Sequence, residues 1–234
     1  YRRVVTLAYP VVFATLATTL MAVVDTLFMG WVGTAAQGAV GLGGILVWTY
    51  ASFFIGAINV VNTFVAQHHG AGNLRTCGAV TWQGLALAAA CSAVVLALLP
   101  ALPPVVGLFG APADVTAIAV AYATIRIWWL PLDLAEAALS SFMRGIGDTR
   151  TPMFITLGAV AVNVPLNYWL IFGGPGVPAM GAEGAAWATV IARGLSLAVF
   201  FALFLRRGWR RRYGTALRLR GLLGGQLAAM VRVG

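Results

Sequence analysis

Asp25 is an isolated acid in an apolar segment. From Val4 to Val32 it is the only charged side chain. A carboxylate at the centre of a membrane-spanning helix costs roughly 2.5 to 3.5 kcal/mol on insertion scales. An acid tolerated in such a place therefore needs a partner or a purpose, such as the binding of a cation or a proton.

Two amides, Asn163 and Asn167, lie four residues apart in a later apolar segment. This spacing puts both on one helix face. Pro165 lies between them and cannot donate to the carbonyl of Ala161, so we expect a kink here. The freed carbonyl, the two amides and a carboxylate from another span could hold a monovalent cation or a hydrated proton. Alternatively, the amides only bond neighbouring helices.

A third set, Arg126, Asp133 and Glu136, is spaced by seven and then three residues, close to one stripe of a helix. Arg126 could form a neutral ion pair with either acid, which is the structural interpretation. The functional alternative is a polar lining of a transport cavity that attracts cationic substrates. Pro131 should bend the helix at this place. The last apolar segment adds Thr189 and Arg193.

Soluble enzyme chemistry has little support in the sequence. His68 and His69 have no nearby acid or cysteine at ligand spacing, so we expect no metal site. The glycine-containing loops match no phosphate-binding pattern, and no nucleophile–base pair is apparent. We therefore expect no cofactor and no enzyme. An intramembrane catalyst using Asp133 and Glu136 is the enzymatic alternative.

The elements that must position these residues are membrane-spanning helices. Of 234 residues, 61% are hydrophobic and 9% charged, with a mean hydropathy of +0.90, whereas soluble domains carry about 25% charged residues. The pattern predicts an all-α integral membrane protein with six spans of about 20 residues or more. They lie near Leu7–Val32, Ala39–Gln67, Cys77–Leu99, Ala117–Phe142, Pro152–Phe172 and Glu183–Leu205.

The arginines indicate an orientation. Twelve of them lie on one side of the predicted membrane: before span one, between spans two and three, between spans four and five, and after span six. The loops on the other side carry no arginine. By the positive-inside rule the N-terminus is cytoplasmic. The net charge of +9 thus reflects topology, and nucleic acid is not an expected partner.

Three segments follow from this map. We expect a six-helix transmembrane lobe over 1–205, a basic cytoplasmic connector over 206–221 and the start of a seventh span over 222–234. Trp209, Tyr213 and Leu217 lie among the connector's arginines and suit contact with anionic headgroups. A loop that only fixes topology is the alternative. The chain starts without Met and ends inside an apolar segment, as expected for a piece of a longer protein.

Several stretches resemble the multidrug and toxic compound extrusion (MATE) transporters, and most closely their DinF-like branch. "VVDTLFMGWVGTAAQGAVGLG" is similar to the family's first span and the turn after it, and "FVAQHHGAGN" to the end of its second. "SFMRGIGDTRTP" resembles the fourth-to-fifth loop, and "NVPLNYWLIFGGPGVPAMGAEGAAWATVIAR" the fifth and sixth spans. Their order and spacing together carry the resemblance over nearly the whole chain.

The resemblance implies the N-terminal half of a two-lobe, twelve-helix transporter of a bacterial cytoplasmic membrane. Such a protein would export cationic or amphipathic organic compounds in exchange for H⁺ or Na⁺, by rocking of the lobes. Its partners would be its small-molecule substrates, membrane lipids and its own C-terminal lobe. In the DinF-like branch the cation site is built from residues that match Asp25, Asn163, Asn167 and Thr189.

The sequence departs from the family pattern at one position: Asn167 stands where the family commonly has Asp. At most one negative charge remains in the matched set, which favours H⁺ over Na⁺ coupling. We expect Asp25 to be protonated from outside, which would let spans one, five and six repack and expel substrate. Release of the proton to the cytoplasm would then reset the site.

Two other functions compete with efflux. A flippase for lipid-linked saccharides shares the two-lobe architecture, but its cavity should carry several cations for the pyrophosphate. Here only Arg126 and Arg193 lie at membrane depth. A non-transporting membrane scaffold would tolerate replacement of Asp25 by Leu.

Overall fold

The structure is a computed structural model that describes residues 2–216. The predicted seventh span lies outside the described residues. The chain folds into helices joined by short turns, and the described part has no β-strand beyond an isolated bridge between Gly174 and Val177. The helices are α1 (Arg2–Val32), α2 (Thr34–Gly70), α3 (Leu74–Ala97), the 3₁₀ turn η1 (Leu99–Ala101), α4 (Leu102–Gly107), α5 (Ala113–Trp128), α6 (Leu130–Gly145), α7 (Arg150–Phe172), α8 (Gly181–Phe204) and α9 (Arg207–Tyr213).

The predicted spans are confirmed by length and composition. Within residues 2–216, five helical stretches are long and apolar enough to cross a membrane, and α5 with α6 forms a sixth that is bent by 45°. The bend lies next to Pro131, as the sequence predicts. Pro131 is in the first turn of α6, where its missing backbone N–H costs least. By contrast, α7 runs through Pro165 as one helix, so a kink there stays a prediction.

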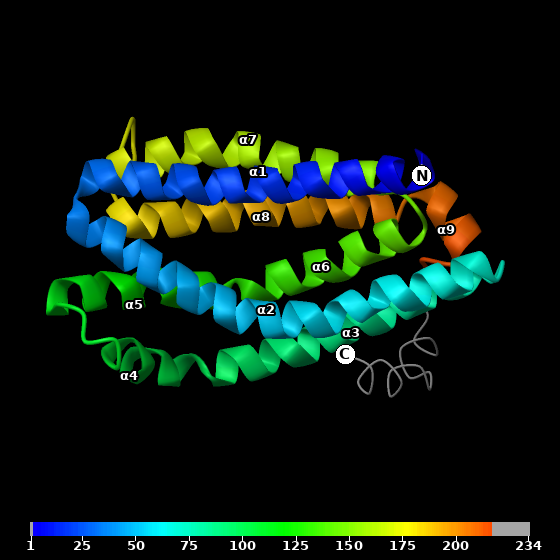
Figure 1. Ribbon diagram of the computed structural model, residues 1–234, viewed down its shortest axis with the longest axis horizontal. Coiled ribbons are helices and arrows are strands. Elements are labelled where there is room, and N and C mark those ends of the chain that lie inside the picture. Colours follow the sequence, from blue (N-terminus) through cyan, green and yellow to red (C-terminus); the bar gives the residue numbers. More distant parts are fainter. Residues whose placement is uncertain (1, 217–234) are drawn as a thin grey trace.

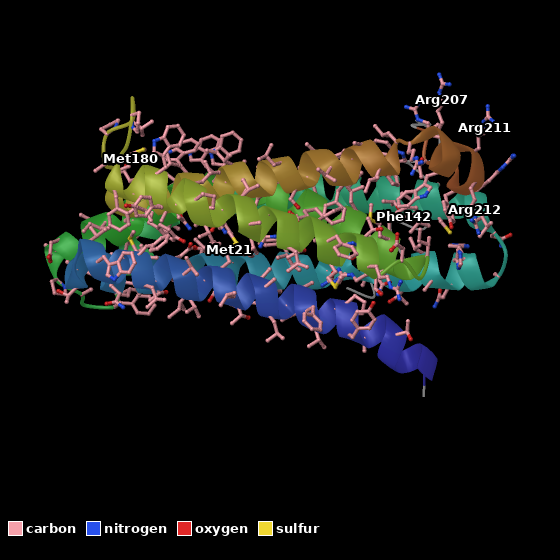
Figure 2. The ribbon with its side chains drawn as sticks, turned by 90° about the horizontal axis from the view of Figure 1, so that it is seen from above. Met21, Phe142, Met180, Arg207, Arg211 and Arg212 are labelled. Carbon is pink, nitrogen blue, oxygen red and sulfur yellow. The ribbon has the colours of Figure 1, made fainter. Side chains whose placement is uncertain are left out.

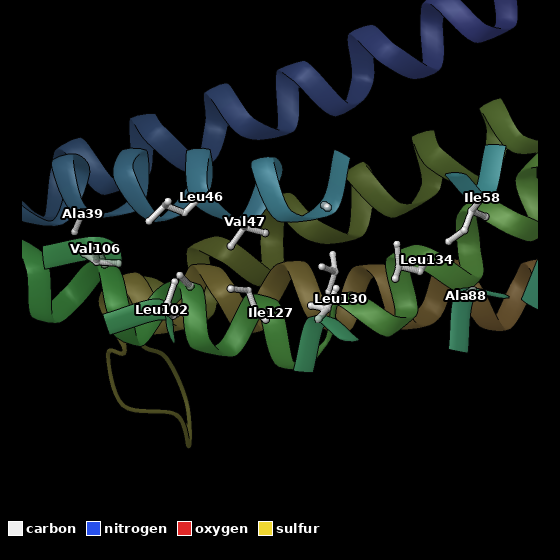
Figure 3. Packing of buried hydrophobic residues seen from close by; sticks show 14 of the residues in the cluster. Ala39, Leu46, Val47, Ile58, Ala88, Leu102, Val106, Ile127, Leu130 and Leu134 are labelled. Atoms are coloured by element: carbon white, nitrogen blue, oxygen red, sulfur yellow. The ribbon is translucent and has the colours of Figure 1, made fainter. Parts of the chain in front are cut away.

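The helices form one elongated bundle with two rows. Helix α7 packs against α1 and α8, while α6 packs against α2, α3 and α8 (Figure 1). Between α2, α3, α4, α5 and α6 lies a hydrophobic cluster that includes Leu46, Leu102, Ile127 and Leu130 (Figure 3). Large apolar side chains such as Leu16, Phe53 and Phe154 remain exposed on the bundle surface, as expected for a protein whose solvent includes lipid.

A group of arginines lies at one end of the bundle. The N-terminus and α9 lie at this end, and Arg207, Arg211 and Arg212 project from it, while Met180 lies at the opposite end (Figures 1 and 2). This arrangement agrees with the separation of charge that the sequence predicts. We call this end the arginine end below.

Helix α9 closes the arginine end and corrects one expectation. Tyr213 is buried, and the rings of Trp209 and Tyr213 lie 5.6 and 5.7 Å from that of Phe142. Headgroup contact by Tyr213 is therefore wrong, because the apolar cluster at the end of α6 takes up its ring. Trp209 is only half-buried, so its contact with headgroups stays a prediction. The arginines of α9 are exposed. Leu217 lies outside the described residues.

Helices α7 and α8 approach each other through a glycine. A Cβ atom added at Gly184 would lie 2.5 Å from the carbonyl oxygen of Leu170, a backbone atom that no rotamer change can move. Membrane helices lack a hydrophobic drive to associate, so such close contacts supply much of their packing energy.

Replacement of Gly184 by Ala should therefore destabilise the bundle by about 1–3 kcal/mol, because the helices must separate to admit the methyl group. The measurement is the reversible unfolding of the full-length protein in mixed micelles. Gly158→Ala is the matched control, because a Cβ at position 158 on α7 meets nothing within 4 Å. Equal stability of the two variants would contradict the packing role.

Candidate functional site

Three of the four residues that the sequence resemblance assigns to a cation site meet between α1 and α7. Asp25 comes from α1, and Asn163 and Asn167 come from α7. Both amides are fully buried, and Asp25 is 9% exposed. Asp25 precedes the end of α1 by seven residues, which places it roughly 10 Å inside the end opposite the arginines.

Asn167 is the centre of this acid–amide site. Its Nδ2 donates one hydrogen bond to Oδ1 of Asp25 and another to Oδ1 of Asn163, the latter over 2.8 Å. An amide nitrogen carries two N–H groups, so both are used. The four-residue spacing on α7 thus places Asn163 where it orients Asn167, and Asn167 in turn faces the carboxylate.

Two polar atoms of the site have no hydrogen-bond partner among the described residues. They are Oδ1 of Asn167 and Nδ2 of Asn163, and both are buried. A buried polar atom without a partner costs about 1–3 kcal/mol. An amide offers a donor and an acceptor on one group, so rotation of Asn167 would present Oδ1 to a protonated Asp25. The acid–amide site can therefore satisfy either protonation state of the acid.

Thr189 is buried on α8 but does not join this site directly. Its hydroxyl donates to the carbonyl of Ala185 over 3.0 Å, one turn back on the same helix. No hydrogen bond links it to Asp25, Asn163 or Asn167 in the described structure. Its assignment to ion coupling stays a prediction.

The second set forms an ion-pair chain across the bend of α5 and α6. Arg126 lies 3.7 Å from Asp133, which confirms that pair. Glu136, however, pairs with Arg193 of α8 over 3.2 Å, and Arg193 also lies 3.7 Å from Asp133. The sequence therefore missed the cation that serves both acids. The four-residue spacing of Thr189 and Arg193 could have indicated it, because it puts Arg193 on the inward face of α8.

Tyr122 connects the two sets. It lies on α5 one turn before Arg126, and its hydroxyl is close enough to Asp25, Arg126 and Asp133 to feel their charges. The three acids and two arginines of this region carry one net negative charge when all are ionised. Asp25 is the acid of the three that has no arginine within 4 Å in residues 2–216. It is therefore the acid best placed to take up one proton and balance the charge.

The fold and the site define a bundle of membrane-spanning helices with one buried acid, Asp25, hydrogen-bonded by an amide side chain. The MatE family matches residues 10–169, more than half of the chain, so the chain belongs to the MatE family. The resemblance drawn from the sequence is thereby confirmed. The family's members are transporters, so the chain is not an enzyme.

Two relatives illustrate the likeness. The chain is 33% identical over 222 residues to the probable multidrug resistance protein NorM of Burkholderia mallei, covering 94% of this chain and 47% of the relative. It is 32% identical over 189 residues to the multidrug resistance protein PmpM of Pseudomonas aeruginosa, covering 80% and 40%. The chain thus spans about half the length of the curated relatives it matches. Membership of the DinF-like branch stays a prediction.

Solved structures share the fold. An outward-facing multidrug resistance MATE family transporter of the MOP superfamily superposes with a TM-score of 0.85 at 20% identity, over 98% of this chain and 50% of that one. The Vibrio cholerae MATE transporter VcmN in its bent form gives 0.81 at 21% identity, over 98% and 51%. The expected six-helix lobe, half of a larger transporter fold, is confirmed.

Proposed function

We propose that the full-length protein is a multidrug efflux antiporter of a bacterial cytoplasmic membrane that exports cationic or amphipathic organic compounds in exchange for H⁺. The names of the relatives, which are multidrug resistance proteins, support the efflux activity. The arginine end supports a cytoplasmic N-terminus, by the positive-inside rule. The full protein would also contain a C-terminal lobe and contact membrane lipids.

The observation that carries proton coupling is the acid–amide site. Asp25 is its only titratable group, and its partners Asn163 and Asn167 are uncharged. Sodium would need enough negative oxygen ligands to offset its dehydration, whereas one acid is sufficient for a proton. Protonation of Asp25 from outside would require Asn167 to rotate, so that the acid donates to Oδ1 in place of accepting from Nδ2. That rotation also breaks the bond from Nδ2 of Asn167 to Oδ1 of Asn163, so the packing of α1 against α7 would change and let the lobe repack.

The ion-pair chain argues against the flippase. Arg126 and Arg193 each have carboxylate partners, so neither is free to bind a pyrophosphate without leaving a buried acid unpaired. Their pairing gives the chain of Arg126, Asp133, Glu136 and Arg193 a structural role, in which it fixes α5 and α6 against α8.

Transport by the full-length protein in proteoliposomes tests the proposal. Efflux of a cationic dye such as ethidium should follow an imposed pH gradient in sodium-free buffer. A Na⁺ gradient imposed at equal pH on both sides should drive little transport. Transport under the Na⁺ gradient alone would overturn proton coupling, and no transport of any cation under either gradient would overturn the efflux proposal.

Asn167→Asp should change the coupling ion. It places a second carboxylate beside Asp25, and the pair would share one proton or hold a Na⁺ ion. Ethidium efflux by this variant should rise several-fold when Na⁺ is added at constant pH. The control is Asn167→Gln, which adds no charge and should show no Na⁺ stimulation. Equal Na⁺ responses in the two variants would show that charge at position 167 does not select the ion.

A further inference from the structure

A polar cavity lies near the arginine end, away from the acid–amide site. It has a volume of about 180 Å³, is open on one side, and is lined by α1, α6, α7 and the turn before α7. Its polar lining consists of one arginine and five hydroxyl side chains: Thr15, Thr18, Ser140, Arg144, Thr149 and Thr156. Since a liquid water takes up roughly 30 Å³, the cavity has room for a group of several heavy atoms.

Arg144 has no acidic partner in the part of the chain that the structure describes. Its Nη2 reaches only neutral oxygens, Oδ1 of Asn59 and Oγ of Ser141, both at 3.4 Å. Its Nε is buried and has no hydrogen-bond partner among the described residues. No acid in residues 2–216 lies within 4 Å of it. This contrasts with Arg126 and Arg193, and a partly buried guanidinium without a counter-charge favours an anion.

The acid nearest to Arg144 in the sequence is Asp148, and its carboxylate already accepts hydrogen bonds from another residue. Asp148 accepts hydrogen bonds from the backbone N–H and the hydroxyl of Thr151, at 3.0 and 2.6 Å, and so caps the start of α7. It therefore serves the helix end and does not neutralise Arg144. The counter-charge must come from a molecule that enters the cavity or from outside the described residues.

The position indicates the source of that anion. Arg144 lies in the last turn of α6 at the arginine end, the depth at which lipid phosphates lie if this end is at the membrane surface. At the rim, the guanidinium of Arg150 stacks over the ring of Tyr9 at 5.9 Å. Phe13 and Phe154, from the two helices that border the cavity, are exposed and suit acyl chains.

We propose that this cavity binds the phosphate of an anionic phospholipid of the inner leaflet, held by Arg144 and by the hydroxyls of Ser140, Thr149 and Thr156. The planar guanidinium matches phosphate oxygens two at a time, and basic pockets between membrane helices bind lipid headgroups in this way. The lipid would join α1 and α7 at the arginine end. This site is separate from Asp25 and does not depend on the coupling ion.

The test is binding of dioleoyl phosphatidylglycerol to the purified full-length protein in detergent, measured by native mass spectrometry and by the shift in unfolding temperature. Dioleoylglycerol, which lacks the phosphate, and glycerol phosphate, which lacks the chains, are the matched ligands. We expect saturable binding of phosphatidylglycerol that is at least tenfold tighter than that of either fragment. Binding of glycerol phosphate as tight as that of the lipid would overturn the lipid source.

Arg144→Gln should weaken phosphatidylglycerol binding at least tenfold, while Arg75→Gln, an exposed arginine at the same end, should leave it unchanged. Arg144→Lys keeps the charge but loses the planar fork, so its affinity should fall between those of wild type and Arg144→Gln. It also provides a second test if the glutamine variant does not fold. Unchanged binding in both Arg144 variants, or equal loss in Arg75→Gln, would overturn the site. Efflux is a separate readout, so failure here leaves the antiport proposal standing.

Discussion

Asp25→Asn should lower proton-driven ethidium efflux by the full-length protein more than tenfold, to near the level of empty proteoliposomes. Asparagine has almost the size of aspartate and still offers Oδ1 to Nδ2 of Asn167, so the contact between α1 and α7 is kept. What is lost is the only titratable group of the acid–amide site. Substrate binding measured by dye fluorescence should change far less than transport.

The control for this prediction is Asp114→Asn, the same chemical change at an exposed acid in the first turn of α5. It should leave transport near the wild-type rate. A second readout is the release of protons when substrate is added to the purified protein, which Asp25→Asn should abolish. Undiminished proton-driven transport by Asp25→Asn would refute a coupling role for this residue.

Arg193→Gln should give the largest loss of stability, about 3 kcal/mol, the lower end of the cost of removing one partner of a buried ion pair, because the side chain of Arg193 is 25% exposed. Arg193 is the cation nearest Glu136, and it shares Asp133 with Arg126. Its removal leaves a charged or newly protonated Glu136 inside the bundle and loosens α8 against α6. The measurement is the free energy of unfolding of the full-length protein in mixed micelles.

A double-mutant cycle identifies the pair as the cause. Glu136→Gln added to Arg193→Gln removes the orphaned carboxylate, so the double variant should recover most of the lost stability. Arg211→Gln, an exposed arginine of α9, is the matched control and should change stability by less than about 0.5 kcal/mol. Strictly additive effects of the two substitutions would show that Glu136 and Arg193 do not stabilise each other.

The sequence predicted the spans, the bend at Pro131 and the closeness of Asp25 to the amides. These features depend on local properties, namely runs of apolar residues, a missing N–H, and a polar group that must find another polar group within an apolar bundle. Asn163 and Asn167 were informative because their spacing alone assigns both to one helix face.

What the sequence could not supply was the rotation of each helix about its own axis. Whether Glu136 faces Arg126 or Arg193 depends on how α6 is rotated relative to α8. Glu136 and its partner Arg193 are 57 positions apart in the sequence. Thr189 shows a second limit, because a threonine hydroxyl in an apolar helix can bond its own backbone and need not reach a neighbour. Tyr213 was misplaced because its burial depends on Phe142, which belongs to another helix.

The single carboxylate of the acid–amide site has a consequence for the electrical balance of transport. With Asn163 and Asn167 uncharged, the proposed proton coupling would carry one elementary charge inward per cycle through Asp25. Export of a singly charged cation cancels that charge, so exchange through this lobe would be electrically silent. A neutral compound leaves it uncancelled, and a membrane potential would then contribute roughly 2.3 kcal/mol per 100 mV. The charge of the exported compound would thus decide whether the membrane potential adds to the pH difference in driving its efflux.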